Sequence, residues 1–278
     1  MSIIKIFLVI ILIIFSISAN GQKTDKKPVM NSVDFPNFLG PIQLTDKPYE
    51  HFFANYYGIN SFSANEQYAT VLRTTIKDHL PNENEPATLG IVDLRNKSFI
   101  PITKTHAWNF QQGCMAHWLS TNPDSLIIYN DLRKGKFVSV ILNVHTKEEK
   151  KVIPYPISAV SPNGKEAISI NFSRLRATRD SYGYAGNGQK SKIKKNYPKD
   201  DGLFLINLDN GVAKLIVSLF DVKKYVPEIK ENSIAYFNHT LFSRKGSKIF
   251  WLSRAKPISL NTTAFTVDRI GTNLKACF

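Results

Sequence analysis

The feature that most constrains how this chain can fold is a two-part β-unit that occurs four times along it. Its first part is a turn followed by a strand, as in Ser161-Pro-Asn-Gly-Lys-Glu-Ala-Ile-Ser-Ile. Its second part is a strand, a polar turn and another strand, as in Leu203-Phe-Leu-Ile-Asn-Leu-Asp-Asn-Gly. The second part recurs around Val92, Val144, Leu208 and Val267. Short β-rich runs divided by turn residues, with almost no helical periodicity, indicate an all-β protein.

The repetition favours a β-propeller of four or more blades. A small antiparallel sheet cannot bury both of its faces alone, so repeated sheets of this kind stack around an axis. A β-sandwich is the alternative, but its strands should not recur as paired units with an S-P-x-G-like opening. The segment from Phe265 to Leu274 predicts a hairpin that begins and does not return. We therefore expect an incomplete ring, in a shortened form of a longer protein.

An insertion from about Ser173 to Asp200 separates the strands of the third unit. Long insertions in compact domains usually carry function or are disordered. The first half, up to Gly186, is rich in aromatic residues and arginine and is expected to be ordered. The second half, Asn187 to Lys199, is rich in lysine and is expected to be mobile.

The first residues predict a secretory signal. Lys5 precedes an apolar run from Ile6 to Ile17, and Ala19 and Gly21 stand at the −3 and −1 positions of a cut before Gln22. The run is shorter than the roughly 20 residues that a membrane span needs. The sequence therefore predicts a signal peptide at 1–21, a propeller domain at 22–278, a secreted or periplasmic location, and no stable membrane span after cleavage.

The net charge of +14 suits an anionic partner. Export makes nucleic acid the least suitable of the anionic partners, so the predicted partner is an acidic polysaccharide and not a nucleic acid.

The chain has two cysteines, Cys114 and Cys277. Whether they pair stays open, and a buried free thiol is the simpler interpretation of Cys114 because it lies in an apolar stretch.

Several segments combine reactive side chains with strand ends, and together they resemble a known group of proteins. The motifs are QQGCM-x-x-W, I-Y-N-D, S-P-x-G, F-S-R-L-x-x-x-R-x-x-Y-G-Y-A-G, D-D-G-L and F-N-H-x-x-F-S, between Trp108 and Leu252. This order is similar to that of exported bacterial propellers, namely polysaccharide lyases of the ulvan-lyase and oligogalacturonate-lyase type. The resemblance covers about half of the chain and is more specific for the propeller than for the lyase activity.

The resemblance implies β-elimination from a uronic acid. Removing the proton α to a carboxylate needs a base, a cation that stabilises the enolate, and an acid for the departing oxygen. Arginine suits the cationic role because its planar fork binds a carboxylate through two hydrogen bonds. The matching positions are His117 or His239 as base, Tyr182 or Tyr184 as acid, and Arg174 or Arg179 as cation.

Four more side chains are predicted to bind the sugar: Gln111, Gln112, Asn130 and Trp108. Every one of these site residues also has a structural interpretation. The amides can satisfy blade backbone, the arginines can pair with Asp131 or Asp180, and tryptophan more often packs in a core than on a sugar. A strand histidine such as His117 can be packed and hydrogen-bonded.

The sequence predicts no cofactor. It contains no H-x-H, H-E-x-x-H or cysteine pair at ligand spacing. Oligogalacturonate lyases of this shape use several histidines for a divalent cation, and the single His239 departs from that pattern, so the cation is left as an alternative.

Two functions remain. The leading hypothesis is an exported propeller that acts on a uronate-containing polysaccharide by β-elimination. The alternative is a non-catalytic glycan-binding or periplasmic scaffold propeller.

Overall fold

The computed structural model describes residues 42–186, 188, 193, 196–226, 233–256 and 262–277. The predicted signal peptide at 1–21 lies outside the described residues, as does much of the second half of the insertion. In the part that is described, no helix combines the length and the apolar character that crossing a membrane requires.

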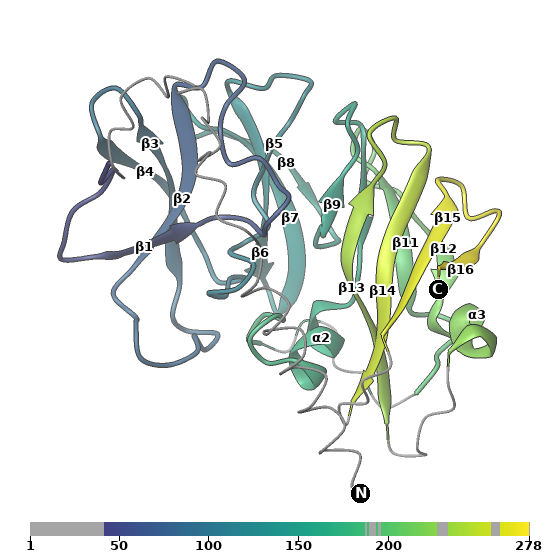
Figure 1. The fold of residues 1–278 in the computed structure, drawn as a ribbon. Coiled ribbons are helices and arrows are strands. Elements are labelled where there is room, and N and C mark those ends of the chain that lie inside the picture. Colours follow the sequence, from purple (N-terminus) through teal and green to yellow (C-terminus); the bar gives the residue numbers. More distant parts are fainter. Residues whose placement is uncertain are drawn as a thin grey trace, which may run out of the picture. The chain divides into compact units, whose positions relative to one another are not determined.

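The described strands form four antiparallel sheets, each of four strands that are neighbours in sequence order (Figure 1). The first sheet holds β1 (Glu50–Phe53), β2 (Tyr68–Thr74), β3 (Ala87–Asp93) and β4 (Ser98–Thr105). The second holds β5 (His117–Trp118), β6 (Leu126–Arg133), β7 (Lys136–Asn143) and β8 (Glu149–Ile153). The third holds β9 (Ala159–Val160), β10 (Glu166–Ser169), β11 (Gly202–Asn207) and β12 (Ala213–Ser218). The fourth holds β13 (Ile234–Phe242), β14 (Lys248–Lys256), β15 (Thr263–Asp268) and β16 (Lys275–Cys277).

Each sheet is one blade, so the predicted β-propeller is confirmed. Helical structure in the described residues is confined to α2 (Phe172–Thr178), α3 (Leu219–Val222) and a 3-10 turn at Lys223–Tyr225. Cys114 is buried and free, and Cys277 is exposed and free.

The blades are held together by apolar side chains that alternate between the two faces of each sheet. Ile127 and Ile128 are neighbours in β6, and both are fully buried. Ile127 packs into the cluster shared with the first sheet, whereas Ile128 packs into the cluster shared with the third. Because successive side chains of a strand point to opposite faces, a strand that is apolar at every position must be covered on both sides.

The turn that opens three of the repeated units uses one hydrogen-bonding device. The hydroxyls of Ser63, Ser161 and Ser243 each accept a hydrogen bond from the backbone N–H five residues later, at 3.0, 3.0 and 3.1 Å. Gly164 and Gly246 follow the second and third of these serines with φ of +67° and +69°. The S-P-x-G-like pattern thus fixes the start of a strand through a serine and a residue that tolerates positive φ.

The expectation that the last hairpin does not return is wrong. β16 pairs antiparallel with β15, with Ala264 opposite Cys277 and Thr266 opposite Lys275. The turn between them closes through a 2.8 Å hydrogen bond from the Asp268 N–H to the Thr272 carbonyl. The returning strand is only three residues long and opens on a lysine, so it lacks the apolar alternation by which strands are found in a sequence.

The ordered part of the insertion is anchored by a buried ion pair. Asn171 caps α2 by accepting a hydrogen bond from the Arg174 N–H. The Arg174 Nε lies 2.9 Å from an Asp201 carboxylate oxygen, which also accepts a 2.9 Å hydrogen bond from the Asn171 amide. A further Arg174 nitrogen donates to the Ala235 carbonyl of β13 at 3.1 Å. These contacts join α2 to the third and fourth blades.

Replacing Arg174 with methionine should destabilise the protein by about 3–5 kcal/mol, because it leaves the Asp201 carboxylate buried without its cation. The free energy of unfolding, measured by chemical denaturation, checks this. Lys248→Met is the control, since it breaks an exposed ion pair with Asp268 and should have a much smaller effect. Equal effects of the two substitutions would contradict the structural role of Arg174.

Candidate functional site

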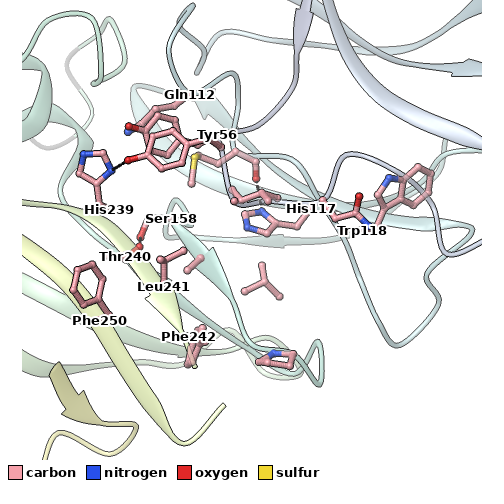
Figure 2. A pocket seen from close by; sticks show the side chains of 18 of the residues that line it. Tyr56, Gln112, His117, Trp118, Ser158, His239, Thr240, Leu241, Phe242 and Phe250 are labelled. Carbon is pink, nitrogen blue, oxygen red and sulfur yellow. Dashed lines mark hydrogen bonds between the residues drawn. The ribbon is translucent and has the colours of Figure 1, made fainter. Parts of the chain in front are cut away.

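Two cavities meet where the four blades converge. The larger, of about 680 Å³, has mostly apolar walls from all four blades (Figure 2). The smaller, of about 500 Å³, is polar; its described lining is Tyr56, Tyr57, Gln111, Arg179, Tyr182, Tyr236, His239, Arg254, Ala255 and Thr262. Tyr56, Tyr57 and His239 line both cavities. We call the two the apolar cavity and the polar cavity.

A tyrosine and a histidine form the boundary between the cavities. The Tyr57 hydroxyl lies 2.9 Å from the His239 Nδ1, and the centre of the Tyr56 ring lies 5.2 Å from that of His239. Both tyrosines come from the connection between β1 and β2, whereas His239 belongs to β13. The contact therefore brings the first and fourth blades together at this point.

The backbone at His239 is strained. The register of β13 against β14 shifts between Asn238 and Leu241, which is a β-bulge, and His239 has a φ of +54°. A non-glycine residue in this left-handed region costs energy, and such residues gather at functional sites. The bulge turns the side chain of His239 away from the regular alternation of the strand and towards the cavities.

Positive charge dominates the polar cavity. Arg179, which follows α2, and Arg254 of β14 both line it, and no aspartate or glutamate is among its described lining residues. Neither arginine forms an ion pair within the described part of the chain. Arg179 stands 5.2 Å from the centre of the Tyr182 ring, and the Arg254 Nε donates a 3.1 Å hydrogen bond to Thr262. An anionic ligand would meet two guanidinium groups that have no carboxylate partner among the described residues.

The same surroundings set the protonation of His239. Burial, and then the positive charges of Arg254 and Arg179, lower the pKa of His239 to about 4, so the ring is neutral at neutral pH. Burial raises the pKa of Tyr236, against the opposing effect of the same two arginines. The polar cavity thus combines a neutral imidazole, protonated phenols and fixed cations.

Of the residues predicted from the sequence, four line the polar cavity: His239, Tyr182, Arg179 and Gln111. Tyr182 lines the cavity whereas Tyr184 is buried, and the close packing of the glycine between them accounts for this difference. A Cβ on Gly183 would lie 2.1 Å from the Arg176 nitrogen, so this segment packs directly on the backbone of α2. Tyr184 then enters the core, where its ring stacks on Phe172 with centroids 4.4 Å apart.

The other predicted residues do not line the polar cavity. Tyr184 and Asn130 are buried and hydrogen-bonded to each other at 2.9 Å, and Arg174 is paired with Asp201. Trp108 is 1% exposed, lines neither cavity, and donates to the Glu85 carbonyl. Gln112 and His117 line the apolar cavity instead.

Six described lining residues were missed by the sequence reasoning, namely Tyr56, Tyr57, Tyr236, Arg254, Ala255 and Thr262. Tyr236 stands directly before the F-N-H motif, and this position could have indicated that Tyr236 belongs to the site. Tyr56 and Tyr57 lie far upstream of every motif, and nothing local relates them to His239. Arg254 lies near the end of a strand, β14, whose pattern indicates only alternation.

The polar cavity does not fit a divalent cation. Such ions prefer carboxylate and carbonyl oxygens or several histidines, and the described lining offers one histidine beside two guanidinium groups. Among the described residues, no group of three or more His, Cys, Asp or Glu side chains converges as a metal site.

Comparison with known proteins supports the fold. No family model and no curated protein matches the chain. The chain is similar to an oligogalacturonate lyase from Vibrio parahaemolyticus, with a TM-score of 0.52 and 11% identity, over 84% of this chain and 54% of that structure. It is also similar to TolB from Acinetobacter baumannii, with a TM-score of 0.46 and 9% identity, over 84% and 44%. The chain spans about half the length of these structures. At such identities the likeness shows a β-propeller alone.

Removing one of the two arginines should raise the pKa of His239. His239 should titrate near pH 4 by NMR, and Arg254→Ala should move its midpoint upwards because a positive charge no longer opposes protonation. Arg95→Ala is the control, because Arg95 is exposed and lies in the turn between β3 and β4. A midpoint near 6.5 in the unsubstituted protein would contradict the geometry of the site.

Proposed function

We propose that this protein binds an acidic, uronate-containing polysaccharide at the polar cavity and cleaves it by β-elimination. The observation that carries the proposal is the convergence of Arg179, Arg254, Tyr182 and the Tyr57–His239 pair on one cavity with no carboxylate in its described lining. The motif order between Trp108 and Leu252 and the net charge of +14 support the same substrate class. The predicted signal peptide supports placing this activity outside the cytoplasm.

In this proposal the arginines bind the substrate and stabilise charge. The uronate carboxylate pairs with Arg179 and Arg254, whose guanidinium groups offer planar, charged hydrogen bonds. When the proton α to the carboxylate is removed, negative charge spreads onto the carboxylate oxygens. The two fixed cations stabilise that charge more than they stabilise the ground state, which lowers the barrier.

The proton transfers fall to the tyrosines and the histidine. Tyr57 takes the α-proton while it passes its own hydroxyl proton to the His239 Nδ1, 2.9 Å away. The C–O bond to the departing sugar then breaks, a C=C bond forms in the uronate ring, and Tyr182 donates a proton to the leaving oxygen. A bound carboxylate offsets the field of the arginines, so it raises the pKa of His239 from about 4 and strengthens the base when substrate is present.

A non-catalytic glycan-binding role is the second candidate. It is favoured by the pKa of His239, because a group with a pKa near 4 is a weak base unless the substrate raises it. Binding needs only the arginines and the exposed aromatic ring of Tyr57, and it makes no demand on the histidine.

The two candidates are separated by ultraviolet absorbance. Polygalacturonate, alginate and glucuronate-containing polysaccharides are incubated with the protein, and the unsaturated uronate product is followed by its absorbance. His239→Ala and Tyr57→Phe should each slow the reaction by about 10²–10⁴-fold. Arg179→Ala should slow it by about 10²–10³-fold. Arg176→Ala is the control, because Arg176 lies on α2 without lining either cavity.

Each result has a defined meaning. Retention of a polysaccharide in affinity electrophoresis without a rise in absorbance would replace the lyase by the glycan-binding role. Full activity of His239→Ala and Tyr57→Phe would remove both residues from the mechanism. Absence of both binding and activity with every uronate polymer would overturn the proposal.

A further inference from the structure

The apolar cavity is chemically unlike the polar cavity beside it. Its walls include Phe62, Met115 and Val160. Phe242 and Phe250 of the fourth blade also line it (Figure 2). Its volume of about 680 Å³ lies within the range of small-molecule sites. Burying apolar surface of a ligand against such walls is favourable at roughly 25 cal/mol per Å².

Several polar groups along these walls are already engaged in hydrogen bonds. The hydroxyls of Ser158 and Thr240 lie 2.6 Å apart, and the Tyr57 hydroxyl is held by His239. The Trp118 indole N–H donates a 2.8 Å hydrogen bond to the Ser61 carbonyl. A sugar ring, with several hydroxyls to satisfy, would therefore lose hydrogen bonds to water without replacing them.

His117 has an acceptor atom on this wall without a partner among the described residues, and its hydrogen bonding fixes what it can offer. Its Nδ1 lies 2.7 Å from the Met115 carbonyl oxygen. A carbonyl only accepts, so Nδ1 carries the proton and Nε2 is an acceptor in the neutral ring. The residue is 8% exposed, and burial lowers its pKa to about 4. No hydrogen bond from the described residues reaches Nε2.

The charge of the lining is low. Of the described residues around the apolar cavity, Arg244 alone carries a permanent charge, and it is exposed. Both histidines in the lining are neutral at neutral pH, since each has a pKa of about 4. An ion placed deep in this cavity would be desolvated without an opposite charge to pair with.

We propose that the apolar cavity binds an uncharged, largely apolar ligand that carries one hydroxyl, a phenol or an alcohol, and that this hydroxyl donates to the Nε2 of His117. The apolar body packs against the aromatic and aliphatic walls, and the single hydrogen bond sets its orientation. This inference does not rest on the glycan cleavage proposed for the polar cavity, although Tyr56, Tyr57 and His239 line both cavities.

The test compares 4-butylphenol with 4-butylanisole, which keeps the apolar body but has no hydroxyl proton. Each is used to displace Nile red, an uncharged dye, from the full-length protein. The phenol should bind about tenfold more tightly, which is the usual worth of one hydrogen bond. His117→Phe should remove this preference, whereas His145→Phe should keep it, because His145 does not line the cavity. If His117→Phe fails to fold, the comparison in the unsubstituted protein decides.

A second substitution tests the cavity itself. Leu241 lines the cavity and is 44% exposed, so Leu241→Trp should fill space with little strain and weaken both ligands by at least tenfold. Equal affinity for phenol and anisole in the unsubstituted protein would overturn the role of His117. Failure of both ligands to bind would overturn the proposal without bearing on glycan cleavage.

Discussion

Burial of both faces of the second sheet is the constraint on which the rest of this structure depends. A strand such as β6, with Ile127 and Ile128 both fully buried, leaves no face for solvent and can exist only between two other sheets. Successive blades meet this need for one another, and their innermost strands turn towards a common centre. Two of these strands, β5 and β9, are only two residues long. Side chains from all four blades line the apolar cavity, and the polar cavity lies beside it.

The polar cavity shows how one short segment divides its charges between folding and function. Arg174 and Arg179 both belong to the first half of the insertion, yet their surroundings are opposite. Arg174 is enclosed and paired with Asp201, which fastens α2 to the blades. Arg179 lines the cavity beside Tyr182 and makes no ion pair in the described part of the protein. A cation left without a partner raises the energy of the free protein, and an anionic ligand recovers that energy on binding.

His239 depends on the same arrangement. Its positive φ and its contact with Tyr57 exist because the bulge in β13 and the connection between β1 and β2 meet. Its low pKa arises from burial and from two arginines, one in the insertion of the third blade and the other in β14 of the fourth. The protonation state of this residue is thus a property of the whole assembly of blades.

The sequence by itself determined the architecture, because the repeated serine-led turns and the apolar strands are local patterns with direct structural meaning. It also narrowed the site to pairs of alternatives for base, acid and cation. Only the tertiary structure placed His239, Tyr182 and Arg179 around the polar cavity and His117, Tyr184 and Arg174 away from it, since no local pattern shows which side chains face one cavity. The tertiary structure likewise brought in Tyr57 and Arg254, and it paired β16 with β15 where the pattern had indicated an open hairpin. The physical reason is that burial and charge at a site are set by residues distant in sequence, whereas strands and turns are set by their neighbours.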